Sequence, residues 1–122
     1  MPGKILVVDD SDDTREMMAK LLELESFTVV TAEDGRAGLN AAAAEHPDLI
    51  ITDINMPNMS GIEMIKILRG QPDFGRVPIM AITAYGSTVA SEALEAGADQ
   101  AATKPIEFDR LIAGVRKLLT RK

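Results

Sequence analysis

The chain has 122 residues, one histidine, no cysteine and a formal net charge of −6, which suits one compact domain. These numbers exclude disulfides and thiolate metal sites, and they disfavour a basic surface for nucleic acid. The longest apolar runs are far shorter than the roughly 20 residues of a membrane-spanning helix, and we expect no signal peptide at the start of the sequence. We expect one cytoplasmic domain over residues 1–122, without membrane association or direct DNA binding.

The first half of the chain alternates short apolar runs with segments of helical spacing. Residues 5–8 are continuously apolar, as in a strand buried on both faces, and residues 28–31 are a weaker strand candidate. Between them, apolar residues from Met17 to Leu22 recur at helical spacing, and Asp13 with Glu16 forms a candidate capping box. Asp34 is placed to cap a second helix through the alanine run 41–44.

The second half continues the same alternation. Residues 49–52 and 79–83 are buried-strand candidates, and 100–103 is a weaker one. Ser60 and Ser87 are placed to cap a third and a fourth helix, the latter ending at Gly97, and a fifth helix buries apolar residues between positions 108 and 119. Residues 70–75 are expected to form a surface loop. Five strands separated by single helices predict an α/β fold with an open, doubly wound parallel sheet.

Polar side chains follow the predicted strands where functional residues gather in such sheets. Asp9 and Asp10 follow the first strand, Asp53 the third, Thr83 the fourth and Lys104 the fifth. Converging carboxylates repel one another, and a hard cation with oxygen ligands, such as Mg²⁺, would relieve that repulsion. An acidic pocket with Mg²⁺, a lysine and a hydroxyl is suited to receiving a phosphoryl group on a carboxylate.

Several motifs together resemble one family, the receiver domain of two-component response regulators, in the form of a single-domain, chemotaxis-regulator-like protein. The resemblance runs from about residue 3 to residue 120. It rests on Val7-Val8-Asp9-Asp10, Asp53-Ile54-Asn55-Met56-Pro57, Ser60-Gly61, Thr83-Ala84, Gly97-Ala98-Asp99 and Thr103-Lys104-Pro105. It implies a flavodoxin-like (βα)5 fold whose five strands have the order 2-1-3-4-5, an order taken from the family.

The resemblance also implies how the acidic residues work. Asp53 would accept a phosphoryl group from a phosphohistidine on a sensor histidine kinase or phosphotransfer protein. Asp10, Asp53 and the main-chain carbonyl of Asn55 would ligate Mg²⁺, with Asp9 acting mainly through a bound water. The same site would slowly hydrolyse the aspartyl phosphate, so the protein is expected to be a signalling phosphoprotein rather than an enzyme with a separate substrate.

Two further residues, and an output surface, follow from the resemblance. Lys104 would pair with the phosphoryl oxygens, Thr83 would turn its hydroxyl toward them, and the Lys104–Pro105 peptide would be cis. The switch would alter the face made by the fourth helix, fifth strand and fifth helix, where a downstream protein or a second copy would bind. The helix after the first strand would face the kinase.

One position departs from the family pattern. Three residues before Lys104, where the family usually has an aromatic switch residue, this chain has Ala101. Tyr85 lies two residues after Thr83, but the sequence does not show that it replaces the missing ring. Elsewhere we expect ordinary structural roles: His46 as a solvated loop residue, and four methionines as core filler, Met17, Met18, Met64 and Met80.

A rival interpretation comes from haloacid-dehalogenase-type phosphatases. The segment Asp10-Ser11-Asp12-Asp13-Thr14 fits their D-x-D-x-T motif, with Asp10 as nucleophile and Asp12 as general acid and base. Two features oppose this reading, because the acidic pair expected after the lysine is missing and the Asp53 motif would have no role.

A third interpretation, a docking module that signals without phosphorylation, receives little support because all the site residues are present.

Overall fold

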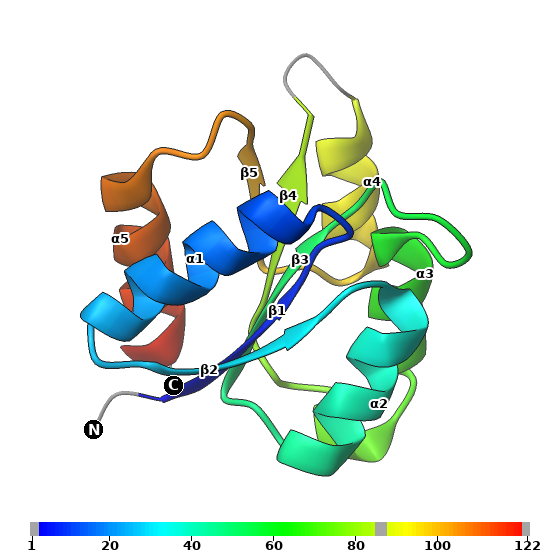
Figure 1. The fold of residues 1–122 in the computed structure, drawn as a ribbon. Coiled ribbons are helices and arrows are strands. Elements are labelled where there is room, and N and C mark those ends of the chain that lie inside the picture. Colours follow the sequence, from blue (N-terminus) through cyan, green and yellow to red (C-terminus); the bar gives the residue numbers. More distant parts are fainter. Residues whose placement is uncertain (1–2, 85–87, 121–122) are drawn as a thin grey trace.

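The computed structural model describes residues 3–84 and 88–120. Five parallel strands form one sheet in the order β2-β1-β3-β4-β5, with helices on both faces (Figure 1). The predicted α/β class and strand order are therefore confirmed. The elements are β1 Lys4–Val8, α1 Asp12–Leu24, β2 Thr28–Ala32, α2 Gly35–Glu45, β3 Leu49–Asp53, α3 Gly61–Arg69, the 3-10 helix Pro72–Phe74, β4 Ile79–Thr83, α4 Val89–Ala96, β5 Gln100–Thr103 and α5 Phe108–Thr120.

The strands differ in burial according to their place in the sheet. Every residue of β3 and β4 is buried, as are Ile5–Val8 of β1, whereas the edge strands β2 and β5 are largely half-buried or exposed. The parallel register pairs Val8 with Thr52 and Asp53 with Ile82, so β1, β3 and β4 end close together. This alignment places whatever follows these strands at one edge of the sheet.

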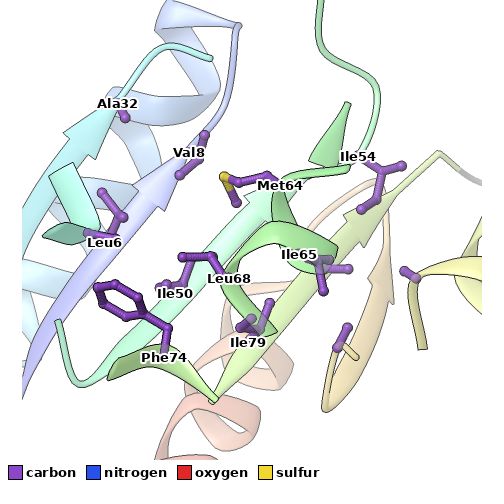
Figure 2. Packing of buried hydrophobic residues seen from close by; sticks show 14 residues of the cluster. Leu6, Val8, Ala32, Ile50, Ile54, Met64, Ile65, Leu68, Phe74 and Ile79 are labelled. Carbon is purple, nitrogen blue, oxygen red and sulfur yellow. The ribbon is translucent and has the colours of Figure 1, made fainter. Parts of the chain in front are cut away.

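Two hydrophobic layers cover the sheet. Helices α1 and α5 pack on one face through residues such as Met18, Leu22 and Val115, and α2, α3 and α4 cover the other (Figure 1). Figure 2 shows this second layer, where Met64 of α3 points toward Val8 and Phe74 lies beside the strand side chains. Both faces of the central strands are thus buried, which explains their continuous apolar runs.

The helix starts correct one of the sequence predictions. Helix α1 is capped by Ser11, whose hydroxyl accepts the N–H of Thr14, and Asp13 lies inside the first turn rather than at the cap. The predicted capping box at Asp13 is therefore wrong, because the chain enters the helix two residues earlier. A capping box does occur in α3, between Ser60 and its third residue, Glu63. The predicted cap at Ser87 lies outside the described residues.

Three further expectations need adjustment. Met17 is 46% exposed, so it is not core filler, whereas Met18, Met64 and Met80 are buried as predicted. His46 is exposed but not in a free loop: it ends α2 in a left-handed conformation, and its ring stacks on Phe74. The predicted loop at 70–75 contains a short 3-10 helix.

None of the helices in the described ranges is long and apolar enough to cross a membrane.

An arginine network joins three elements at the end of the sheet where β4 and β5 begin. Arg69, the last residue of α3, is 17% exposed, as is the side chain of Asp99 before β5. Its guanidinium makes four hydrogen bonds, of 2.7 to 2.9 Å, to the carbonyls of Gly97, Phe74 and Val77 and to the carboxylate of Asp99. The same Asp99 oxygen accepts the N–H of Ile79 at 2.9 Å.

Candidate functional site

Three carboxylates meet at the opposite end of the sheet, where the C-terminal ends of the strands lie. Asp9 and Asp10 follow β1, and Asp53 is the last residue of the neighbouring β3. One oxygen from each lies within 4.8 Å of the other two. The prediction that these residues converge is confirmed, and the reason is the parallel register, which brings the carboxyl ends of β1 and β3 side by side.

The environment of these carboxylates is unfavourable for charge. Asp9 is fully buried and Asp53 is 4% exposed, whereas Asp10 is exposed. Burial raises the pKa of Asp9 above the ordinary value of 3.8, the hydrogen bond from the Ser11 N–H opposes this shift, and the charge of Asp53 adds to it. The native fold therefore carries an electrostatic cost at this edge that a cation would remove.

The donor set fits a hard divalent cation. Oδ1 of Asp9 accepts the Ser11 N–H at 2.8 Å, but its Oδ2 is buried and accepts no hydrogen bond within the described parts of the chain. A buried oxygen without a donor is costly, and a bound cation supplies the missing partner. Three carboxylates in reach of one point, without nitrogen or sulfur, are ligands that suit Mg²⁺ or a similar ion.

A lysine and a threonine complete the site from β4 and β5. Nζ of Lys104 lies 3.2 Å from Oδ2 of Asp53, and the main-chain N–H of Lys104 donates to the carbonyl of Thr83 at 2.8 Å. The Lys104–Pro105 peptide is cis, as expected. Thr83 is buried, and its hydroxyl donates to the carbonyl of Ala102 in β5 at 3.4 Å. The structure thus brings both predicted residues to the acidic edge.

The remaining predicted positions are placed as follows. Asn55 is exposed in the loop after β3, two residues beyond Asp53, and its role as a carbonyl ligand stays a prediction. Ala101 lies half-buried on β5, so no aromatic ring stands there. Tyr85 lies outside the described residues.

Close backbone contacts position Asp53. A Cβ built on Gly61 would lie 2.3 Å from the carbonyl oxygen of Asp53, so only glycine lets α3 begin this close to β3. The N–H of Gly61 donates to the carbonyl of Ile54 at 2.9 Å, and the hydroxyl of Thr52 donates to the carbonyl of Asp53 at 2.8 Å. The phosphoacceptor candidate is therefore held by its main chain on both sides.

Sequence reasoning missed one contact of this site. Nη1 of Arg15 donates to the main-chain carbonyl of Asp9 at 2.8 Å, and Nη2 pairs with the carboxylate of Asp12. The available signal was weak: a basic residue six positions after the first aspartate, in the first turn of the helix that follows it. Such a residue is otherwise an ordinary surface cation.

The same contact bears on the phosphatase interpretation. Asp12, its proposed general acid and base, is 77% exposed, pairs with Arg15 and is not part of the three-carboxylate cluster. Asp109, an acidic residue that follows the lysine, lies in the first turn of α5. The nucleophile–acid arrangement of that enzyme class is not formed by these residues.

Comparisons with known proteins support one family. The response regulator receiver domain profile matches residues 5–116. The response regulator MprA of Mycolicibacterium vanbaalenii is 38% identical over 122 residues, which cover 99% of this chain and 52% of that protein. The chain thus spans about half the length of this curated relative.

Solved structures agree with the sequence match. The chemotaxis response regulator CheY4 of Vibrio cholerae superposes with a TM-score of 0.89 at 32% identity, covering 97% of this chain and 99% of that one. The receiver domain of the Francisella response regulator 1452 gives 0.90 at 32% identity, covering 98% of each chain. These folds are of the receiver type, which rules out the dehalogenase interpretation. The chain belongs to the response regulator receiver domain family of two-component systems.

Proposed function

We propose that this protein accepts a phosphoryl group on Asp53 from a phosphohistidine of a histidine kinase or phosphotransfer protein. The observation that carries the proposal is the placement of Asp53, buried at the end of β3 beside two carboxylates and 3.2 Å from the ammonium of Lys104. In the transfer, the phosphorus–nitrogen bond of phosphohistidine breaks and a phosphorus–oxygen bond to the Asp53 carboxylate forms. The imidazole nitrogen of the donor leaves with the electron pair.

The other residues have distinct parts in this step. Asp10, Asp53 and the main-chain carbonyl of Asn55 would hold Mg²⁺, with Asp9 acting mainly through a bound water. When bound, Mg²⁺ supplies positive charge that stabilises the transferring phosphoryl oxygens. The ammonium of Lys104 leaves Asp53 Oδ2 and pairs with those oxygens. Water then slowly attacks the aspartyl phosphate, which releases inorganic phosphate and restores the carboxylate.

The switch connects the site to the face formed by α4, β5 and α5. The hydroxyl of Thr83 donates to the carbonyl of Ala102 in β5, and a phosphoryl dianion on Asp53 would compete for that hydroxyl. Since position 101 is alanine, the change would pass through the backbone of β5 rather than through an aromatic ring. Replacing Thr83 with alanine is expected to leave phosphorylation intact and abolish the change in this face, measured by amide NMR shifts on β5.

The partners follow from this function. A sensor histidine kinase or phosphotransfer protein supplies the phosphoryl group, and a downstream protein or a second copy reads the α4-β5-α5 face. Residues 1–122 would form one cytoplasmic receiver domain, and this domain would not itself contact DNA or membranes.

The decisive experiment is phosphorylation by acetyl phosphate in the presence of Mg²⁺. Intact-mass spectrometry is expected to show one added phosphoryl group on the native chain and none on Asp53→Asn. The matched control is Asp12→Asn, which changes an exposed carboxylate outside the cluster and should label normally. Stable label on Asp53→Asn, with loss of label on Asp10→Asn, would overturn the proposal.

A second measurement addresses the phosphorylation-independent docking module. Mg²⁺ titration and then beryllofluoride, a phosphoryl mimic, are expected to perturb amide signals around Asp53 and on β5. An absence of both responses would favour the docking module instead.

A further inference from the structure

We propose that Arg15 is a positioning residue that fixes the Asp9–Asp10 peptide and thereby sets the affinity of the acidic site for its cation. The inference rests on the proposed function of that site. It assigns a part to a residue that contacts neither the cation nor Asp53. The effect would come from the backbone of the β1–α1 loop.

The contacts of Arg15 are unusual for a residue on the first turn of a helix. Its side chain is 14% exposed, and it turns back toward β1 instead of extending into solvent. The two ends of the guanidinium fork bind different groups, Nη1 the Asp9 carbonyl and Nη2 the Asp12 carboxylate. Because this fork is planar and permanently charged, it fixes both partners with little loss of its own freedom.

The carbonyl that Arg15 binds controls the direction of Asp10. The carbonyl of Asp9 and the N–H of Asp10 share one planar peptide unit, so anchoring the carbonyl also limits the rotation of that unit. The side chain of Asp9 is anchored separately, by the Ser11 N–H at 2.8 Å and by complete burial. Asp10, the exposed member of the cluster, depends more on the orientation of its backbone. Arg15 thus supplies the fixation that burial gives to Asp9 and Asp53.

The second end of the fork binds a carboxylate outside the cluster. Asp12 lies two residues after Asp10 and is not part of the cluster. Its pairing with Arg15 keeps one of its oxygens directed at the guanidinium. This pairing steadies Arg15 from the outside, but 77% exposure of Asp12 makes it the weaker of the two contacts.

Simple electrostatics gives the opposite expectation, which makes the inference testable. A guanidinium near a cation site repels the cation, so on charge alone its removal should tighten Mg²⁺ binding. If Arg15 instead positions Asp10, its removal weakens binding despite the lost repulsion. The sign of the change separates the two accounts.

The experiment measures Mg²⁺ affinity of the unphosphorylated full chain, by calorimetry and by amide NMR shifts of Asp9 and Asp10. We expect Arg15→Gln to weaken Mg²⁺ binding about tenfold, the lower end of the loss seen when groups behind metal ligands are removed. Arg15→Lys keeps the charge without the fork and should fall between Arg15→Gln and the native chain. Asp12→Asn keeps the Arg15–Asp9 contact and should stay within about twofold of the native affinity.

Urea unfolding of each variant, in the absence of Mg²⁺, separates positioning from a purely structural role. A purely structural role would lower stability and leave the Mg²⁺ affinity of the folded protein unchanged. Equal or tighter Mg²⁺ binding by Arg15→Gln would overturn the inference. If Arg15→Gln does not fold, Arg15→Lys decides: binding weaker than that of Asp12→Asn supports the inference, and equal binding overturns it. A native chain that binds no Mg²⁺ would instead overturn the proposed function itself.

Discussion

The two ends of the parallel sheet accommodate buried charge in opposite ways. Where the strands begin, Arg69 makes four hydrogen bonds, one of them to the carboxylate of Asp99. Where they end, three carboxylates face a single lysine contact, and one buried oxygen of Asp9 lacks a donor in the described structure. At the first end the charged groups are paired within the chain, whereas at the second end the carboxylates need a bound cation as a partner.

This difference indicates how the molecule divides stability from function. A satisfied network at the beginning of β4 and β5 holds α3 and the α4–β5 connection in place. The repulsion at the other end stores a driving force for binding a cation and for accepting a change in charge. Removing groups from the two ends should therefore change stability in opposite directions.

The largest effect on stability is expected at the end of the sheet where β4 and β5 begin. Arg69→Met would leave three main-chain carbonyls and the Asp99 carboxylate short of a donor, and we expect the free energy of unfolding to fall by about 3 kcal/mol. Urea denaturation followed by circular dichroism measures this change. The matched control is Arg110→Met, since that side chain is 85% exposed and its pairing with Glu107 at 3.7 Å should be worth less than about 0.5 kcal/mol. Equal losses from both variants would remove the contrast between the two ends.

A smaller loss of stability is expected for a substitution beside Asp53. Gly61→Ala forces a Cβ against the Asp53 carbonyl, and we expect a cost of about 2 kcal/mol together with slower phosphorylation by acetyl phosphate. Gly70→Ala is the control, because Gly70 has helical φ and ψ and its Cβ would approach nothing closer than 3.5 Å. That control should gain roughly 0.5 kcal/mol by restricting the unfolded chain. A Gly61→Ala protein as stable as the native chain would show that the close approach can relax.

The smallest expected effect is a gain in stability at the end of the sheet that carries the three carboxylates. Without divalent cations, Asp9→Asn removes a buried charge, and the new amide can donate to the neighbouring carboxylates. We expect a gain of about 1 kcal/mol at pH 7 together with loss of Mg²⁺ affinity. A variant less stable than the native chain at pH 7 in a chelator would contradict this.

The pH dependence gives the same prediction a second test. Because the native pKa of Asp9 lies above its unfolded value of 3.8, the native state holds this proton more tightly than the unfolded state does. The contribution of Asp9 to stability is therefore complete below pH 3.8 and is lost as the pH rises through the raised native value. The advantage of Asp9→Asn should accordingly grow from acid toward neutral pH in urea titrations.

The sequence predicted the central strands more firmly than the edges for a physical reason. β3 and β4 are covered on both faces and so require continuous apolar runs, whereas β2 and β5 at the edges tolerate Thr31 and Thr103 in exposed positions. The convergence of Asp9, Asp10 and Asp53 followed from strand order, since the ends of adjacent parallel strands meet. Their roles, and those of Thr83 and Lys104, stay predictions until phosphorylation is measured.

The contacts that escaped prediction are tertiary ones. Arg69 and Asp99 are 30 residues apart, and nothing in local periodicity pairs them. Arg15 reads as a surface cation of an amphipathic helix until the backbone turn at Asp9 is known. Met17 has helical apolar spacing, yet it lies at the border of the buried stripe of α1 and remains 46% exposed. Such details depend on how neighbouring elements pack, which periodicity does not encode.

The stacking of His46 on Phe74 has a practical consequence for spectroscopy. The chain contains one histidine, so its imidazole resonances are unique and need no assignment among several rings. His46 ends α2 at the side of the sheet where the strands begin, and its ring centroid lies 6.1 Å from that of the buried Phe74. It therefore serves as an internal reference: events confined to the acidic edge should leave its signals unmoved, and loosening of the core beneath α2 should shift them.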